Sequence, residues 1–247
     1  MVAITGARPS EQSERAFFLG MILLTTAIVL WGFAPSFFLR GMVPLSLHSY
    51  LDPPLQPIRW LYIAHGLVFT VWVALGLTQA VLVASGRTGL HRRLGRIAFV
   101  LAPALVVMGL AASGYATVHG FHDAPLPAAT FSAVPLFSLA LYSAFVTAGL
   151  AARRQPQAHK RWMLFAMIVI AAAGWDRIDA LNPPGLPSWL STELVLLVPI
   201  LAWDLARLGR LHVATLWGSA AIAAVFSLRL WVGATPAWLA LVRGVTG

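Results

Sequence analysis

The sequence predicts an all-α integral membrane protein whose seven transmembrane helices form a single domain over residues 1–247. Hydrophobic residues make up 59% of the chain and charged residues only 10%, whereas an ordinary soluble domain has roughly a quarter of charged residues. The apolar residues also stand in long runs, each of about the ~20 residues that a spanning helix requires. Little sequence remains between these runs for a soluble domain.

The expected spans are separated by short connections. Nearly uncharged runs lie at residues 16–38, 60–85, 95–117, 129–151, 160–179, 188–206 and 211–231. Arg8 and Arg15 precede the first run, as basic residues precede the apolar core of a signal peptide. It is longer than the ~7–15 residues of a signal-peptide core and has no convincing cleavage site, so we expect it to stay as the first span.

The remaining runs differ in how well they suit a bilayer. Pro103, Pro135 and Pro199 are expected to kink the third, fourth and sixth spans. The fifth has fourteen uncharged residues, from Trp162 to Trp175, or ~21 Å at 1.5 Å per residue against ~30 Å of hydrocarbon. Charged residues must therefore enter this span. Residues 235–242 are too short to span and are expected along the membrane interface.

The basic residues predict the orientation. With a cytoplasmic N-terminus and an external C-terminus, twelve of the 17 Lys and Arg lie inside: Arg8, Arg15, Arg87, Arg92, Arg93, Arg96, Arg153, Arg154, Lys160, Arg161, Arg207 and Arg210. Five lie outside: Arg40, Arg59, Arg177, Arg229 and Arg243. The net charge of +9 then points to anionic lipid headgroups of a bacterial inner membrane as the partner, and not to nucleic acid.

An internal repeat is possible, relating residues 60–117 to residues 129–179. Each segment has a helix that descends to the inner side, a short basic turn and a returning helix. The turns read His91-Arg92-Arg93-Leu94 and His159-Lys160-Arg161-Trp162. Ordinary basic-turn composition is the alternative explanation of so short a match.

The histidines at the inner boundary are the first candidate site. The absence of cysteine excludes c-type haem attachment and thiolate-held iron–sulfur clusters. Imidazoles of His91 and His159 are expected to be able to hold haem iron or another metal. The adjacent Arg92, Arg93, Lys160 and Arg161 are expected to meet haem propionates or a phosphate headgroup. His212 is a possible third member. The alternative is that all of these are interfacial residues without a ligand.

A second candidate site lies near the outer surface. His65 stands inside the second run, about five residues beyond Trp60, and an ionisable residue at such depth usually faces the bundle interior. It is expected to join a polar layer formed by Asp176, Arg177, Asp179, Glu193 and Arg229. This layer would be a substrate or proton cavity, or else a network of interhelical salt bridges. His119 and His122 in the adjacent turn are expected to cap it.

These motifs resemble a bacterial multi-pass membrane family designated domain of unknown function 2306. The resemblance rests on His65 and Gln79, on His91-Arg92-x-x-Gly95-Arg96, and on His159-Lys160-Arg161-Trp162-Met163 followed by Arg177, so it covers residues 65–177. It implies a seven-helix-like membrane fold but no established reaction. The functional positions that it implies are His65, His91, Arg92, Arg96, His159, Arg161 and Arg177.

A weaker similarity is to di-haem b-type transmembrane cytochromes. It implies one inner bis-histidine haem between His91 and His159, whereas an outer haem would need His65 together with His119 or His122.

The sequence therefore favours an electron-transfer protein that binds haem b or quinone through histidines of its second, third and fifth helices. A small-molecule or proton-coupled transporter with an outer polar cavity is one alternative, and an accessory subunit bound to a membrane protein partner is another.

Overall fold

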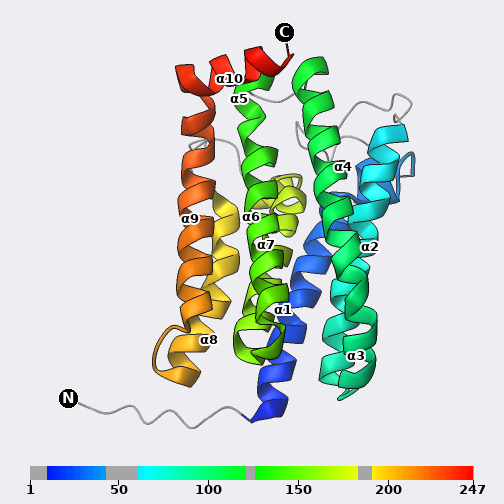
Figure 1. Ribbon diagram of the computed structural model, residues 1–247, viewed down its shortest axis with the longest axis vertical. Helices are drawn as coiled ribbons and strands as arrows, with labels where there is room; N and C mark the ends of the chain where they lie inside the picture. The colour runs from blue at the N-terminus through cyan, green and yellow to red at the C-terminus, as the bar shows by residue number, and fades with distance from the viewer. Residues whose placement is uncertain (1–9, 43–59, 121–125, 183–190, 247) are drawn as a thin grey trace, which may run out of the picture.

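The computed structural model describes residues 10–42, 60–120, 126–182 and 191–246. Within these ranges every regular element is a helix, which confirms the expected all-α class (Figure 1). The α-helices are α1 (Glu11–Gly32), α2 (Trp60–Ala84), α3 (Thr88–Leu94), α4 (Ala98–His119), α5 (Ala128–Phe131), α6 (Ala133–Ala151), α7 (Pro156–Trp175), α8 (Val198–Leu208), α9 (Val213–Gly233) and α10 (Pro236–Thr246). Shorter π and 3₁₀ segments are η1 (Ala34–Phe38), η3 (Gly95–Ile97), η4 (Ala152–Arg154), η5 (Asp179–Leu181) and η6 (Thr192–Leu197).

Five helices of the described chain are long and apolar enough to cross a membrane. They are Glu11–Gly32, Trp60–Ala84, Thr88–His119, Ala128–Arg154 and Val213–Gly233. They coincide with the first, second, third, fourth and seventh expected spans. Their number, length and composition are those of a multi-pass membrane protein.

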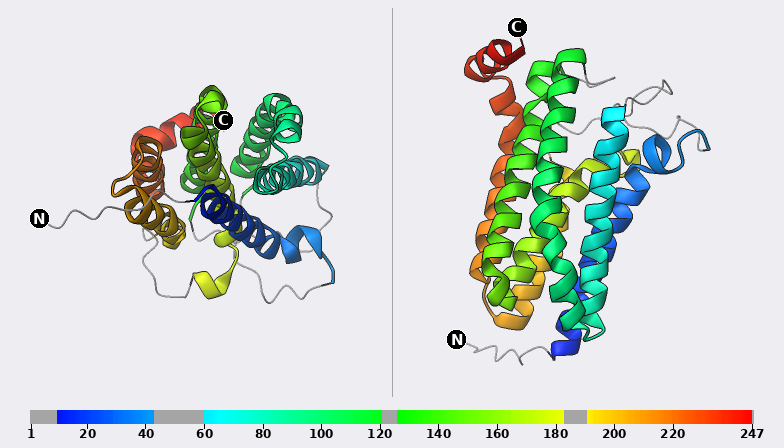
Figure 2. Two further views of the ribbon diagram at one scale, coloured as in Figure 1. Left: turned by 90° about the horizontal axis from the view of Figure 1, so that it is seen from below. Right: turned by 45° about the vertical axis from the view of Figure 1, so that its right-hand side comes forward.

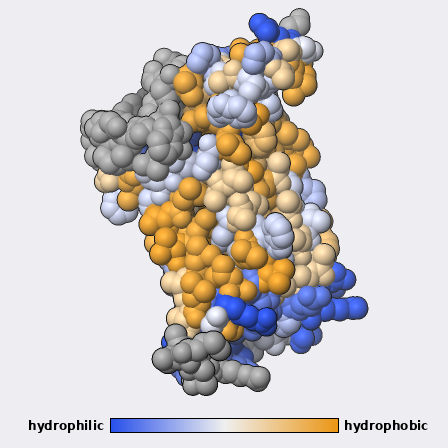
Figure 3. Space-filling view, turned by 90° about the vertical axis from the view of Figure 1, so that its left-hand side faces the viewer, coloured by the Kyte–Doolittle hydropathy of each residue, from blue (hydrophilic) through white to orange (hydrophobic). Residues whose placement is uncertain are grey.

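The long helices run along one common direction and give the bundle two distinct ends (Figure 1). One end holds the start of α1, the α3 turn and the α8–α9 turn, and we call it the basic end because Arg87, Arg92, Arg93, Arg96, Arg153, Arg154, Arg207 and Arg210 lie there. At the opposite end α10 turns across the top of α9 (Figure 2). On one face, apolar side chains form a broad band above a hydrophilic lower end (Figure 3).

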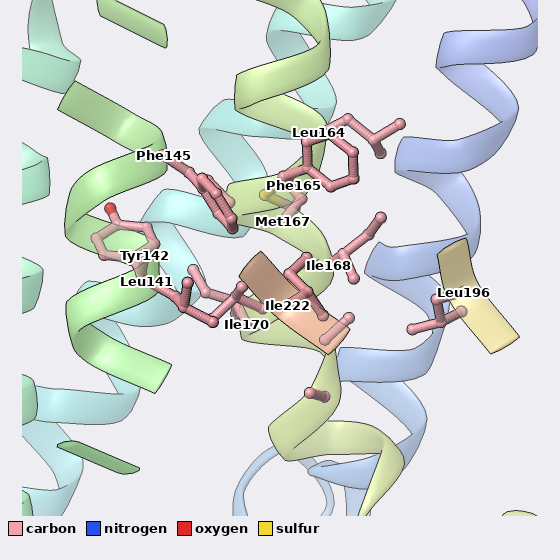
Figure 4. Close-up of a cluster of buried hydrophobic side chains, with 14 of the residues drawn as sticks. Leu141, Tyr142, Phe145, Leu164, Phe165, Met167, Ile168, Ile170, Leu196 and Ile222 are labelled. Carbon is pink, nitrogen blue, oxygen red and sulfur yellow. The ribbon is translucent and has the colours of Figure 1, made fainter. Parts of the chain in front are cut away.

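Helix α7 lies at the centre of the bundle and packs against α1, α6 and α9. Twelve of its 20 residues are buried, among them Phe165 and Ile168 in the main apolar cluster (Figure 4). Because neighbouring helices cover α7, it tolerates the lower hydropathy that Lys160 and Arg161 give it. This position explains why α7 lacks the composition of the five lipid-facing helices.

Two glycines set the spacing between α1 and α7. A Cβ on Gly32 would lie 2.1 Å from the carbonyl oxygen of Gly174, and a Cβ on Gly174 would lie 2.8 Å from the carbonyl oxygen of Ile28. The backbones approach this closely only because neither residue has a side chain, as is common where membrane helices meet.

The expected sixth span differs in form from a single long helix. Residues 188–190 lie outside the described chain, and the remainder consists of the 3₁₀ segment η6 followed by the 11-residue α8. Pro199 stands in the first turn of α8 and Pro135 in the first turn of α6. Both prolines follow a break in the helical run, between α5 and α6 and between η6 and α8, so their expected kinks stay predictions. Pro103 does lie inside α4.

Candidate functional site

The two expected inner histidines lie next to each other at the basic end. His91 belongs to α3 and His159 to the first turns of α7, and their ring centroids are 6.2 Å apart with the ring planes at 80°. The α2–α3–α4 segment and the α6–η4–α7 segment each contribute one ring. We call these two side chains the histidine pair.

Each ring of the histidine pair is oriented by the helix that precedes its turn. His159 donates through Nδ1 to the carbonyl oxygen of Gly149 in α6, at 2.8 Å, so its Nε2 carries a lone pair. His91 Nδ1 faces the side-chain amide of Gln79 in α2. The amide of Gln79 is oriented so that both of its ends have a partner. Its nitrogen then donates to Nδ1 of His91, and its oxygen accepts from the backbone N–H of Gly95 at 3.0 Å.

The cations near the histidine pair fall into two groups. Arg161 is wholly buried and forms an ion pair with Asp204 of α8, while its Nε also donates to Thr215 of α9 at 3.1 Å. Lys160 forms an ion pair with Glu14 of α1 at 2.5 Å. These contacts join α7 to α1, α8 and α9. Arg161, expected as a cofactor ligand, therefore directs its donors towards other helices.

Arg92 and Arg96 have a different setting. They are exposed and line an open pocket of about 420 Å³ together with Gly89 and Arg93. Among the described residues no carboxylate forms an ion pair with these three arginines.

His65 lies apart from the histidine pair, in the second turn of α2. Its Nδ1 lies 3.3 Å from the carbonyl oxygen of Met108 in α4, and its ring packs against Phe69 at 4.2 Å between centroids. The Met108 contact joins α2 to α4, as expected for an interhelical hydrogen-bonding residue, whereas Phe69 belongs to α2 itself.

The expected outer polar layer is present in part. Arg229 of α9 lies 2.5 Å from Glu193 of η6 and 3.9 Å from Asp176, which follows α7. Its Nη1 also lies 3.4 Å from the hydroxyl of Ser138 in α6. Glu193 and Arg229 are buried, and we call Asp176, Glu193 and Arg229 the outer triad.

Other expected members of the layer lie elsewhere. Asp179 was expected in the layer beside Asp176, but α7 ends at Trp175 and Asp179 stands exposed in the separate segment η5. The extended backbone of Ile178 breaks the helical spacing between them. Arg177 donates to the carbonyl oxygen of Ala173 at 2.6 Å and packs over the ring of Phe33.

The histidine-rich turn is only partly described. His119 ends α4, where its ring stacks on Tyr115 and its Nδ1 lies 3.0 Å from the Tyr115 carbonyl oxygen. His122 and Asp123 lie outside the described residues. Within the described ranges no group of three or more His, Asp or Glu side chains is placed to hold a metal ion.

Three polar residues of these sites were missed in the sequence. Asp204 has no exposed surface. It is the only acidic residue between residues 194 and 247 and stands within an apolar run, which could have indicated a buried ion pair. Glu14 precedes the first apolar run and resembles an ordinary helix-start acid. Gln79 was expected to matter only because of the family resemblance, although a side-chain amide within a membrane span needs hydrogen-bond partners.

No family model, curated protein or solved structure matches this chain. The resemblance to the family of unknown function and the weaker similarity to b-type cytochromes therefore remain predictions.

Proposed function

We propose that this chain is an integral membrane electron-transfer protein of the bacterial inner membrane, with a haem b or another redox metal bound by the histidine pair. The 6.2 Å separation of the His91 and His159 rings carries the proposal. His91 and His159 would hold the metal through their imidazole nitrogens, which are common ligands of haem iron and of other redox metals. Bound haem would supply a one-electron couple.

The proposal includes seven spans with the basic end in the cytoplasm. Helix α7 has 20 residues, roughly 30 Å at ~1.5 Å per residue. Segments η6 and α8 have 6 and 11 residues, roughly 28 Å together at their different rises. We therefore count these two with the five apolar helices as seven proposed spans, and the positive-inside rule supports a cytoplasmic N-terminus.

The hydrogen bond at Nδ1 of each imidazole determines whether its Nε2 is available to bind a metal. His159 already has the tautomer of a metal ligand, because its Nδ1–H is held by the Gly149 carbonyl and its Nε2 is available. His91 reaches the same state when Gln79 turns its amide oxygen towards Nδ1. The amide of Gln79 thus selects between a metal-binding His91 and a proton-donating His91.

The second tautomer favours a second candidate function, a proton-exchanging pair in a proton-coupled transporter. When Gln79 donates to Nδ1 of His91, the proton of neutral His91 is on Nε2, whereas Nε2 of His159 carries a lone pair. One ring is then a donor and its neighbour an acceptor, which suits proton transfer through a bridging water.

An absorbance spectrum separates the two functions. The full chain, purified gently from haem-producing cells, is recorded oxidised and dithionite-reduced beside the His91→Ala/His159→Ala variant, with His65→Ala as the matched control. We expect Soret and α bands in the wild type and in the control but not in the double variant. A chain without these bands and without stoichiometric iron or copper contradicts the redox centre and leaves the proton-exchanging pair.

Gln79 offers a sharper test of the same site. Gln79→Glu supplies an acceptor to Nδ1 of His91 and should strengthen metal binding, whereas Gln79→Leu should weaken it by roughly 10–100-fold. Equal metal affinity in both variants would show that His91 is not a ligand.

A further inference from the structure

Three arginines converge on one pocket at the basic end. Arg92, Arg93 and Arg96 line the open pocket of about 420 Å³ beside Gly89. Arg96 is held against Arg93, since its Nε donates to the Arg93 carbonyl oxygen at 3.4 Å. Like charges one helical turn apart repel each other weakly, so an anion bound between the arginines would relieve this repulsion. We call it the arginine pocket.

Three other cations at the same end have acidic partners within the chain. Arg15 pairs with Glu11, Lys160 with Glu14 and Arg161 with Asp204. In the described chain the arginines of the pocket have no such acid. Among the described residues, carboxylates thus neutralise cations of α1 and α7, whereas the exposed arginines of the pocket are open to an anion from outside the chain.

The surroundings of the arginine pocket indicate an amphiphilic anion. Leu90, Ile97, Phe99 and Val100 flank the arginines along α3, η3 and α4 and are 50%, 47%, 52% and 75% exposed. A soluble anion would leave this apolar surface in water. The acyl chains of a lipid would cover it while the phosphate met the guanidinium groups, which bind phosphate in a bidentate manner.

We propose that the arginine pocket binds the phosphate headgroup of an anionic membrane lipid. Charge complementarity and the adjoining apolar surface identify this occupant. The inference requires the chain to lie in a membrane but does not rest on a metal at the histidine pair.

Lipid retention tests the proposal. The full chain in detergent is mixed with dioleoyl-phosphatidylglycerol or dioleoyl-phosphatidylcholine, and bound lipids are counted by native mass spectrometry. The pocket variant is Arg92→Gln/Arg93→Gln/Arg96→Gln. The matched control, Arg153→Gln/Arg154→Gln/Arg210→Gln, removes three exposed cations from the same end without touching the pocket.

We expect the pocket variant alone to lose phosphatidylglycerol, by roughly fivefold for each arginine removed. Phosphatidylcholine should bind weakly to all three proteins. If the pocket variant fails to fold, the Arg92→Lys/Arg93→Lys/Arg96→Lys variant keeps the charge but loses the bidentate donors, and it should show an intermediate loss.

Three outcomes overturn the proposal. Equal losses in the pocket and control variants would show that general surface charge attracts the lipid. Full competition by millimolar inorganic phosphate would identify a soluble anion as the ligand. Loss of a haem spectrum in the pocket variant, with lipid binding retained, would assign the arginines to the acidic groups of a cofactor.

Discussion

Arg161 and Asp204 form an ion pair in which neither side chain has any exposed surface. The pair joins the central helix α7 to α8, and Asp204 also accepts the backbone N–H of His212 at 3.0 Å, where α9 begins. One carboxylate thus fixes the relative positions of three helices at the basic end.

Removing the charge of Asp204 should therefore destabilise the bundle strongly. We expect Asp204→Asn to cost about 3 kcal/mol, because it leaves a buried guanidinium unpaired. Thermal unfolding in detergent, followed by size-exclusion chromatography, measures the loss. The exposed Asp179→Asn is the control, and Arg161→Met/Asp204→Leu should recover much of the stability. An Asp204→Asn melting curve like that of the control would show that the pair contributes nothing.

The contact between α1 and α7 gives a second prediction. Gly32→Ala places a Cβ against the Gly174 backbone, so the helices must separate at a cost of about 1–3 kcal/mol. Gly20→Ala in the same helix meets nothing within 4 Å and should leave the melting temperature unchanged or slightly raised. Equal melting temperatures for the two variants would contradict the close approach.

The outer triad predicts a ranking of two substitutions. Glu193→Gln removes the partner that lies 2.5 Å from Arg229, whereas Asp176→Asn removes one at 3.9 Å that is partly exposed. The first should cost about 2 kcal/mol and the second clearly less. The same thermal assay measures both, and the reverse order would mean that Asp176 is the main counterion of Arg229.

His212 predicts a pH dependence of stability. Its Nδ1 accepts the Ala214 N–H at 3.1 Å and caps α9, while burial and the nearby Arg161 lower the pKa of His212 below its ordinary value of 6.5. The neutral ring is therefore favoured in the folded state, and protonation favours the unfolded state. We expect the melting temperature to fall as the pH drops below 6.5, and to fall less in His212→Asn, which caps without titrating. Identical pH profiles would rule out this role.

Much of the fold could be predicted from the sequence because lipid imposes simple requirements on composition. Five of the seven expected spans are helices in the described chain that are long and apolar enough to cross a membrane, because α1, α2, α4, α6 and α9 expose much of their surface and must be apolar. Helix α7 and the η6–α8 segment carry weaker signals because they are covered by other helices or interrupted. Lys160 and Arg161 of α7 are neutralised by Glu14 and Asp204, which lie far from them in the sequence.

The candidate sites, like the fold, could be predicted from the sequence only in their local features and not in their tertiary contacts. The basic turns at His91 and His159 predicted two similar local environments, but only the packing of α3 beside α7 brings the rings together. Arg161 and Arg93 are equivalent in the two turns, yet one is buried against an acid and the other lines an open pocket. No local pattern distinguishes them, because the distinguishing partner is on α8.

The central position of α7 has a consequence for the order of synthesis. Lys160 is neutralised by an acid on α1, which leaves the ribosome before it, whereas Arg161 is neutralised by an acid on α8, which leaves after it. A nascent chain that ends between these helices holds Arg161 without its counterion. We therefore expect α7 to be accessible to added protease in chains truncated before Asp204, although their four apolar helices still anchor them in the membrane, and to be protected in chains that include α8. Helix α7 thus becomes a stable part of the bilayer only after the segment that follows it has been made.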